Sequence, residues 1–145
     1  MNKETYTAYC DILRSELIPA MGCTEPIALA LTAAIARKHL EGDVTDVHIS
    51  TSGNIIKNAK SVTVPHTNGL KGIDAACAAG IVAGDPDAGL EVLSHITPHQ
   101  QKDILDFLHT VPVTVSKATS EYLLDIEVTL QSVQHTVYAR TAQYH

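Results

Sequence analysis

The sequence predicts an α+β fold, and two patterns along its 145 residues carry that prediction. Small and apolar residues at helical spacing dominate the first part of the chain. From Val113 onward, segments of alternating apolar and polar residues follow one another, with Ser, Thr and Gln between them. We therefore expect N-terminal helices packed around a central Ala-rich helix, and a mainly antiparallel sheet that a C-terminal meander completes. A chain of this length can bury one core, so residues 1–145 are expected to form a single domain.

The N-terminal part predicts two helices. From Glu4 to Leu17, apolar side chains fall near one face, which indicates an amphipathic helix that Pro19 ends. From Pro26 to Leu40 the residues are apolar almost all round, which is typical of a buried central helix. The basic residues Arg37-Lys38-His39 near its end suit the negative pole of the helix dipole.

The middle of the chain mixes short segments with a second Ala-rich helix. Val44 to Thr51 alternates roughly and predicts a strand. A short helical turn is expected from Ile55 to Ala59 and a brief strand from Ser61 to Pro65. Ile73 to Ala83 predicts a helix of small residues. Because small residues let two backbones approach closely, this helix is expected to pack tightly on the one that begins at Pro26.

Two shorter helices and three strands are expected in the remainder. Asp85-Pro86 has the cap and the first-turn proline of a short helix that runs to Leu93. Thr97-Pro98-His99-Gln100 is typical of a capping box and predicts a helix from Thr97 to about His109. The C-terminal meander is then expected from three alternating segments, Val113–Lys117, Leu123–Gln131 and Thr136–His145.

Composition and charge exclude several classes of function. The net charge of −6 and the absence of a Lys/Arg run argue against a nucleic-acid partner. No apolar stretch is long enough to cross a membrane, and the N-terminus lacks a signal-peptide core. Three irregularly spaced cysteines do not suit a disulfide framework, so a reducing cytoplasm is expected. The chain stops at Tyr144-His145 within a strand pattern, and we therefore expect it to be the N-terminal part of a longer protein.

The segment Met21-Gly22-Cys23-Thr24-Glu25-Pro26 is the most informative of the chain. Thr24 is a good helix cap, and the two residues after it suit a first helical turn. A thiol just before a helix lies in the positive field of the helix N-terminus and near free N–H donors. Both favour the thiolate, which binds metal or attacks carbon. The alternative is that Cys23 is a small apolar residue packed at a helix start.

Polar residues follow the strand that is expected to end at Thr51. In the run Ser52-Gly53-Asn54-Ile55-Ile56-Lys57-Asn58, the glycine lets the backbone approach a ligand, and the Asn and Lys side chains could hold a carboxylate. The alternative is a turn with an exposed lysine. Lys57 could form a Schiff base, but no phosphate-cradling run accompanies it, so a pyridoxal site is not expected.

A second candidate loop is His66-Thr67-Asn68-Gly69-Leu70-Lys71-Gly72, which opens the helix at Ile73. Its backbone N–H groups could bind an anion, and the alternative is an ordinary flexible loop. The other histidines are scattered and expected on the surface. Cys10 and Cys77 fall in expected helices, where buried inert thiols are usual, so a site built from all three cysteines is not expected. The sequence contains no CxxC and no HExxH motif.

Four segments in order resemble the L-cysteine desulfidase family, which is related to the iron–sulfur L-serine dehydratase alpha chain. They cover nearly the whole chain: Pro19-Ala-Met-Gly-Cys-Thr-Glu-Pro-Ile-Ala-Leu-Ala, Ser52-Gly-Asn-Ile-Ile-Lys-Asn, Gly69-Leu-Lys-Gly and Ala83-Gly-Asp-Pro-Asp-Ala-Gly-Leu-Glu-Val-Leu. The resemblance implies a carbon–sulfur or carbon–oxygen lyase that performs β-elimination. L-Cysteine would give pyruvate, ammonia and sulfide, and L-serine would give pyruvate and ammonia.

The resemblance also implies a cofactor, and beside it we place hypotheses for the roles of other residues. The cofactor would be a [4Fe-4S] cluster with Cys23 as one ligand and the remaining cysteines in a missing C-terminal portion. Thr24 and Glu25 would shape the edge of the cluster, and His66 or Lys71 could be the base. The residues expected to position the substrate are Ser52, Gly53, Asn54, Lys57 and Asn58. With one matched ligand, this chain alone is not expected to assemble the cluster or turn over.

Two other interpretations stay open from the sequence. The chain could be a non-catalytic amino-acid-binding or regulatory module that uses the Gly-rich loops without metal, or a structural lobe. The small-residue helices and the unfinished strand edge also favour self-association or pairing with a missing portion.

Overall fold

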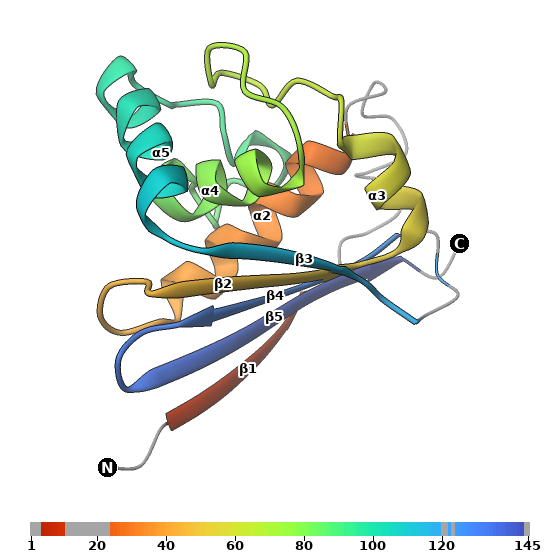
Figure 1. The fold of residues 1–145 in the computed structure, drawn as a ribbon, viewed down its shortest axis with the longest axis vertical. Helices are drawn as coiled ribbons and strands as arrows, with labels where there is room; N and C mark the ends of the chain where they lie inside the picture. The colour runs from red at the N-terminus through yellow and green to blue at the C-terminus, as the bar shows by residue number, and fades with distance from the viewer. Residues whose placement is uncertain (1–3, 11–23, 120–121, 123, 144–145) are drawn as a thin grey trace.

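The computed structural model describes residues 4–10, 24–119, 122 and 124–143, which form two layers, with helices on one face of a five-stranded sheet (Figure 1). The strands are β1 (Glu4–Cys10), β2 (Asp46–Thr51), β3 (Val113–Lys117), β4 (Leu124–Gln131) and β5 (His135–Gln143). The helices are α2 (Thr24–Lys38), α3 (Gly53–Ala59), α4 (Ile73–Ala83) and α5 (Pro98–Thr110), with a short 3-10 helix at Gly89–Glu91. The α+β fold class is confirmed.

The sheet is mixed, with strand order β1-β5-β4-β2-β3. Strand β4 is antiparallel to both of its neighbours, and its ladder with β5 is the longest in the sheet. The outer strands are parallel to the strands beside them, β1 to β5 and β3 to β2. Strands β1, β2, β3 and β5 therefore all run in one direction, and their carboxyl ends lie at the same edge of the sheet.

The two Ala-rich helices form the centre of the core, as expected. Helix α4 packs so closely on α2 that a Cβ added to Gly80 would lie 2.1 Å from the carbonyl oxygen of Ala30. Helix α2 also lies on the sheet, where the Thr32 hydroxyl donates to the Ala28 carbonyl at 2.8 Å and bonds the Thr141 hydroxyl of β5 at 2.6 Å. These contacts hold α2 between α4 and the sheet.

Most of the expected helices are confirmed. The helix expected from Pro26 to Leu40 is α2, and α4 has the expected bounds. Helix α5 begins with the expected capping box, because the Thr97 hydroxyl accepts from the Gln100 amide at 3.2 Å while the Gln100 side chain accepts from the Thr97 amide at 3.0 Å. None of the helices in the described ranges is long and apolar enough to span a membrane.

The prediction of an N-terminal amphipathic helix is wrong for the part of that segment that the structure describes. Glu4–Cys10 is strand β1, paired in parallel with β5, and the rest of the expected helix lies outside the described residues. The segment is rich in Thr and Tyr, which favour strands when a neighbouring strand is present to pair with. The helical spacing of its apolar residues did not outweigh that pairing.

Three shorter expectations also need correction. Strand β3 does not join the meander but pairs in parallel with β2, where it gives β2 a second neighbour. The expected strand at Ser61–Pro65 is reduced to a single bridge between Thr63 and Lys71. The short helix expected from Asp85 to Leu93 is one 3-10 turn at Gly89–Glu91. The antiparallel β4–β5 hairpin of the expected meander is confirmed.

Candidate functional site

One edge of the sheet gathers several of the segments singled out in the sequence. The carboxyl ends of β1, β2, β3 and β5 lie there, and helix α3 follows directly after β2. Thr32, in the middle of α2, bonds Thr141 near the end of β5, so α2 crosses the sheet close to this edge. Figure 1 shows α3 beside the start of α2, in agreement with their packing contact. We call this region the α3 edge, defined by residues 24–28, 51–59 and 117.

The turn at Ser52 is held firmly by strand β4. The Ser52 amide donates to the Asp125 carbonyl at 2.9 Å, and the Thr51 hydroxyl donates to the same oxygen at 2.9 Å. The Ser52 carbonyl accepts from the Ile56 amide at 3.1 Å, which begins α3. Ser52 itself is buried. The backbone at Ser52 and Gly53 is thus fixed in place before any ligand arrives, as substrate positioning requires.

The remaining polar residues of α3 face solvent. Asn54, Lys57 and Asn58 are exposed, while Ile55 and Ala59 anchor the helix in the core. The Asn58 amide nitrogen donates to the Asn54 side-chain oxygen at 3.4 Å, one helical turn away. The two amides therefore form one polar surface at the α3 edge, next in sequence to the lysine.

Lys117 is a residue of this edge that the sequence analysis missed. It lies opposite Thr51 in the β2–β3 ladder, and the Ala118 amide donates to the Thr51 carbonyl at 2.8 Å. Its side chain runs over Gly53, where an added Cβ would lie 2.9 Å from the Lys117 Cε and 3.4 Å from its Nζ. Only the parallel pairing of β3 with β2 reveals this proximity, and no local sequence signal carries it.

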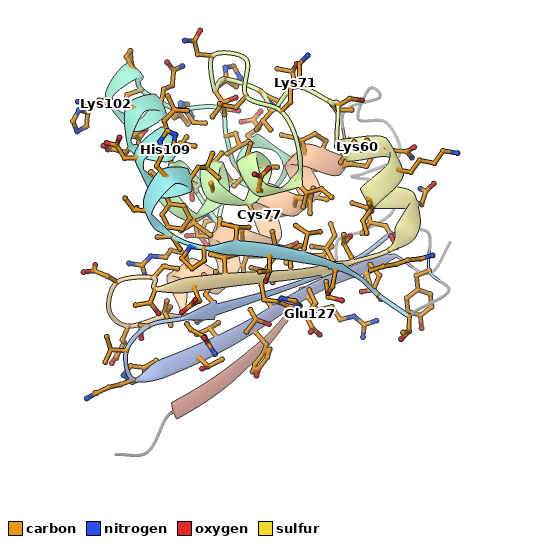
Figure 2. All side chains as sticks on the ribbon, in the orientation of Figure 1. Lys60, Lys71, Cys77, Lys102, His109 and Glu127 are labelled. Carbon is orange, nitrogen blue, oxygen red and sulfur yellow. The ribbon has the colours of Figure 1, made fainter. Side chains whose placement is uncertain are left out.

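The two candidate bases lie on a different loop. His66 and Lys71 are exposed, and the bridge between Thr63 and Lys71 closes the loop that carries them. His66 has a positive φ of 62°, and its carbonyl accepts from the Gln101 side chain of α5 at 3.0 Å. His66 is thereby tied to α5. Figure 2 shows Lys71 on the loop above α4, and Lys60 beside α3.

Cys23 lies outside the described residues, directly before Thr24, the first residue of α2. The backbone of Cys10 ends β1 opposite Thr141, and Glu25 is partly buried in the first turn of α2. The helix start expected after Cys23 is therefore confirmed.

Cys77 has the properties of a structural thiol. It is fully buried between α4 and α2, with its Sγ 3.8 Å from the Leu29 carbonyl oxygen. Burial, with a smaller effect from Asp74, raises the pKa of the Cys77 thiol far above its usual range. Over the described ranges no three His, Cys, Asp or Glu side chains form a metal site.

Comparison with known proteins finds several relatives, and those described below are all named UPF0597 protein. The chain is 46% identical over 140 residues to a UPF0597 protein of Desulfitobacterium hafniense, covering 97% of this chain and 33% of the relative. It is 51% identical over 120 residues to a UPF0597 protein of Finegoldia magna, covering 83% of this chain and 29% of the relative. A UPF0597 protein of Oleidesulfovibrio alaskensis is 41% identical over 145 residues, covering 100% and 33%.

No family model matches the chain, and no solved structure matches it either. The relatives carry the name UPF0597 protein and not that of the L-cysteine desulfidase family, so the family assignment drawn from the four sequence segments is wrong. The relatives' names state no activity. The chain is similar to UPF0597 proteins, and it spans about a third of the length of those it matches.

Proposed function

We propose that this chain contributes to an iron–sulfur-dependent lyase that catalyses β-elimination from L-cysteine or L-serine. Cys23 would be one ligand of a [4Fe-4S] cluster, and the α3 edge would hold the amino-acid substrate. The observation that carries the proposal is the start of α2 at Thr24, directly after Cys23, at the edge where the carboxyl ends of β1, β2, β3 and β5 meet.

The environment of a helix start supports a thiolate at Cys23. Helix α2 has 15 residues and a core-buried body, so its dipole and its free N–H groups act at Thr24 and just before it. Both lower the cost of the thiolate, the form that binds iron. Glu25 in the first turn opposes this effect in part. Cys77 offers the opposite setting, since burial keeps its thiol protonated.

The α3 edge supports the binding of a small amino acid. Ser52 and Gly53 present a fixed backbone, and Asn54, Lys57 and Asn58 supply amides and a cation within one short helix. A carboxylate and an amine are the groups that such donors and acceptors recognise. His66 and Lys71 remain the candidates for the group that takes the α-proton.

Cys23 is the one ligand assigned in this chain, so further thiolates would come from polypeptide outside it. When bound, an open iron of such a cluster supplies a Lewis acid for the leaving thiol or hydroxyl. This chain alone would be inactive, and its partner would be the rest of a longer protein, as the relatives' length suggests. The odd number of cysteines favours the cytoplasm as the site of the reaction.

The test is anaerobic turnover by the whole protein that the gene encodes. We expect pyruvate from L-cysteine or L-serine, and we expect Cys23→Ser to lower the rate by more than the ~10–100-fold typical of residues that only support a metal ligand. Cys77→Ala is the matched control and should leave the rate unchanged, because that thiol is sealed in the core. A Cys23→Ser variant with the full rate would contradict the role of Cys23.

A non-catalytic amino-acid-binding module is the second candidate, because the amides of α3 are exposed and ready to bind without metal. Calorimetry of this chain with L-cysteine and L-serine in metal-free buffer separates the two candidates. Tight binding together with no pyruvate from the whole protein would favour the module over the lyase.

A further inference from the structure

The face of the sheet that points away from the helices carries a hydrogen-bonded row of three side chains. We call it the open face, and Figure 2 shows Glu127 on it, on the side of the sheet opposite α4. His48 of β2 lies opposite Thr114 of β3, and Ser116 stands two residues further along the same face of β3. All three side chains are exposed to solvent. This row is separate from the α3 edge and independent of the proposed lyase function.

The three contacts fit one tautomer of His48. The Thr114 hydroxyl donates to the Val47 carbonyl at 3.4 Å, and His48 Nδ1 lies 2.7 Å from the same hydroxyl oxygen. In the tautomer that keeps the bond between Thr114 and Val47, Nδ1 donates to Thr114 and Nε2 carries the lone pair of the imidazole. Nε2 lies 3.1 Å from the Ser116 Oγ, within reach of the hydroxyl proton of that serine.

This arrangement is the one that activates a serine. A serine oxygen becomes a nucleophile when an adjacent base takes its proton while a third group orients that base. In this row His48 would be the base, and Thr114 would hold its tautomer through Nδ1. A cavity of about 220 Å³ lies at the Thr114 end of the row, where His48 and Thr114 line it together with Asp46 and Pro112. Ser116 does not line this cavity, and its side chain is open to solvent on the sheet surface.

We propose that Ser116 is a nucleophile that accepts acyl groups from small activated carboxylic esters. The Ser116 Oγ forms a bond to the carbonyl carbon and the bond from that carbon to the alcohol oxygen breaks. The proton of Ser116 passes to His48 Nε2 and from there to the departing alcohol. Water then attacks the acyl-serine in the reverse sense, which releases the carboxylic acid and restores the hydroxyl. A threonine in the place of the usual carboxylate gives the imidazolium no countercharge, so turnover is slow.

The experiment uses a fluorophosphonate probe on the folded chain, because that reagent makes a stable adduct. The Ser116 Oγ–phosphorus bond forms, the phosphorus–fluorine bond breaks, and His48 takes the proton. We expect peptide mass spectrometry to place the adduct on Ser116. His48→Gln is expected to slow labelling by about 100-fold, the lower end of the contribution of a positioned base. Release of 4-nitrophenol from 4-nitrophenyl acetate should fall with it.

Ser50 is the matched control, since it lies opposite Ser116 in the ladder and on the same face. Ser50→Ala should label at the wild-type rate, while Ser116→Ala should carry no serine adduct. These residues are on the sheet surface, and circular dichroism confirms that each variant is folded. The proposal is overturned by an adduct at another residue, by equal labelling of His48→Gln, or by no adduct on the folded chain.

Discussion

The two faces of the sheet are built from the same strands and differ in almost every property. On the face that the helices cover, strand residues such as Val47, Ile49 and Ile126 are buried and apolar. On the open face, their neighbours His48, Ser50 and Glu127 are polar and reach solvent. The alternation of side chains along each strand makes this division possible. We therefore expect stability to depend on the covered face, and we assign the proposed chemistry to the open face and to the α3 edge.

The largest expected effect is on the covered side, at the contact of α4 with α2. In Gly80→Val, the added Cβ would lie 2.1 Å from the Ala30 carbonyl oxygen, and backbone cannot yield as a flexible side chain can. We expect the cost to exceed the ~1–3 kcal/mol of ordinary overpacking and to abolish cooperative unfolding in urea. A variant that unfolds with the wild-type midpoint would show that the two helices are further apart.

Creating a cavity in the covered face should lower the free energy of unfolding by less than Gly80→Val does, but still by a large amount. Ile126 is fully buried on β4, so Ile126→Ala is expected to lower the free energy of unfolding by about 3 kcal/mol. Thr129 lies on the open face of the same strand, and Thr129→Ala should change it by less than ~0.5 kcal/mol. Urea denaturation measures both. Equal losses would break the distinction between the two faces.

Asp125 is an exception on the open face, because its carboxylate is buried. Arg140 covers it, donating from Nε and Nη2 to the two carboxylate oxygens at 2.9 and 2.8 Å. This hydrogen bonding raises the pKa of Arg140 above its already high value. Arg140→Gln should cost about 2 kcal/mol, less than a fully buried pair, because Arg140 is partly exposed.

A double-mutant cycle with Asp125→Asn isolates the pair. The double variant should be more stable than the sum of the two single losses predicts, since neither partner is left with an uncompensated charge. Simple additivity would mean that the ion pair does not stabilise the fold.

Within one pH unit of the ordinary thiol range, the smallest expected effect is a pH dependence at Cys77. Burial raises the pKa of the Cys77 thiol in the folded chain. The unfolded chain therefore loses the thiol proton at a lower pH than the folded chain does. The folded state keeps its full stability below the ordinary thiol range and loses stability as the pH rises past that range. Above about pH 9 the free energy of unfolding should fall with a slope of up to ~1.4 kcal/mol per pH unit from this group. Cys77→Ala should remove that part of the slope, as urea titrations at several pH values will show.

Local signals explain how much of the fold could be predicted from the sequence. The capping box of Thr97 and Gln100 and the small residues of α4 each specify their structure within a few residues. Strands β1 and β3 depend on partners far away in the chain, His135–Thr141 and Val47–Thr51 respectively. The strand at β1 was expected to be a helix, whereas β3 was expected over its observed bounds but beside the wrong strand. Long-range pairing decided both outcomes.

The candidate sites likewise divide into one with a local sequence signal and others that depend on long-range strand pairing. The run from Ser52 to Asn58 can be recognised in the sequence, because Gly and Asn residues come directly after a strand. The structure places this run at a sheet edge. Lys117 and the row of His48 with Ser116 carry no local signal, because only the register of β3 on β2 brings them together. The register is a property of the folded sheet and not of any short segment.

The proposed function is tested most directly by the iron and acid-labile sulfide content of the whole protein after anaerobic purification. Our account predicts that the wild-type protein and Cys77→Ala hold equal amounts of both, while Cys23→Ser loses the cluster and its visible absorbance. A Cys23→Ser protein with undiminished iron, sulfide and absorbance would contradict the account.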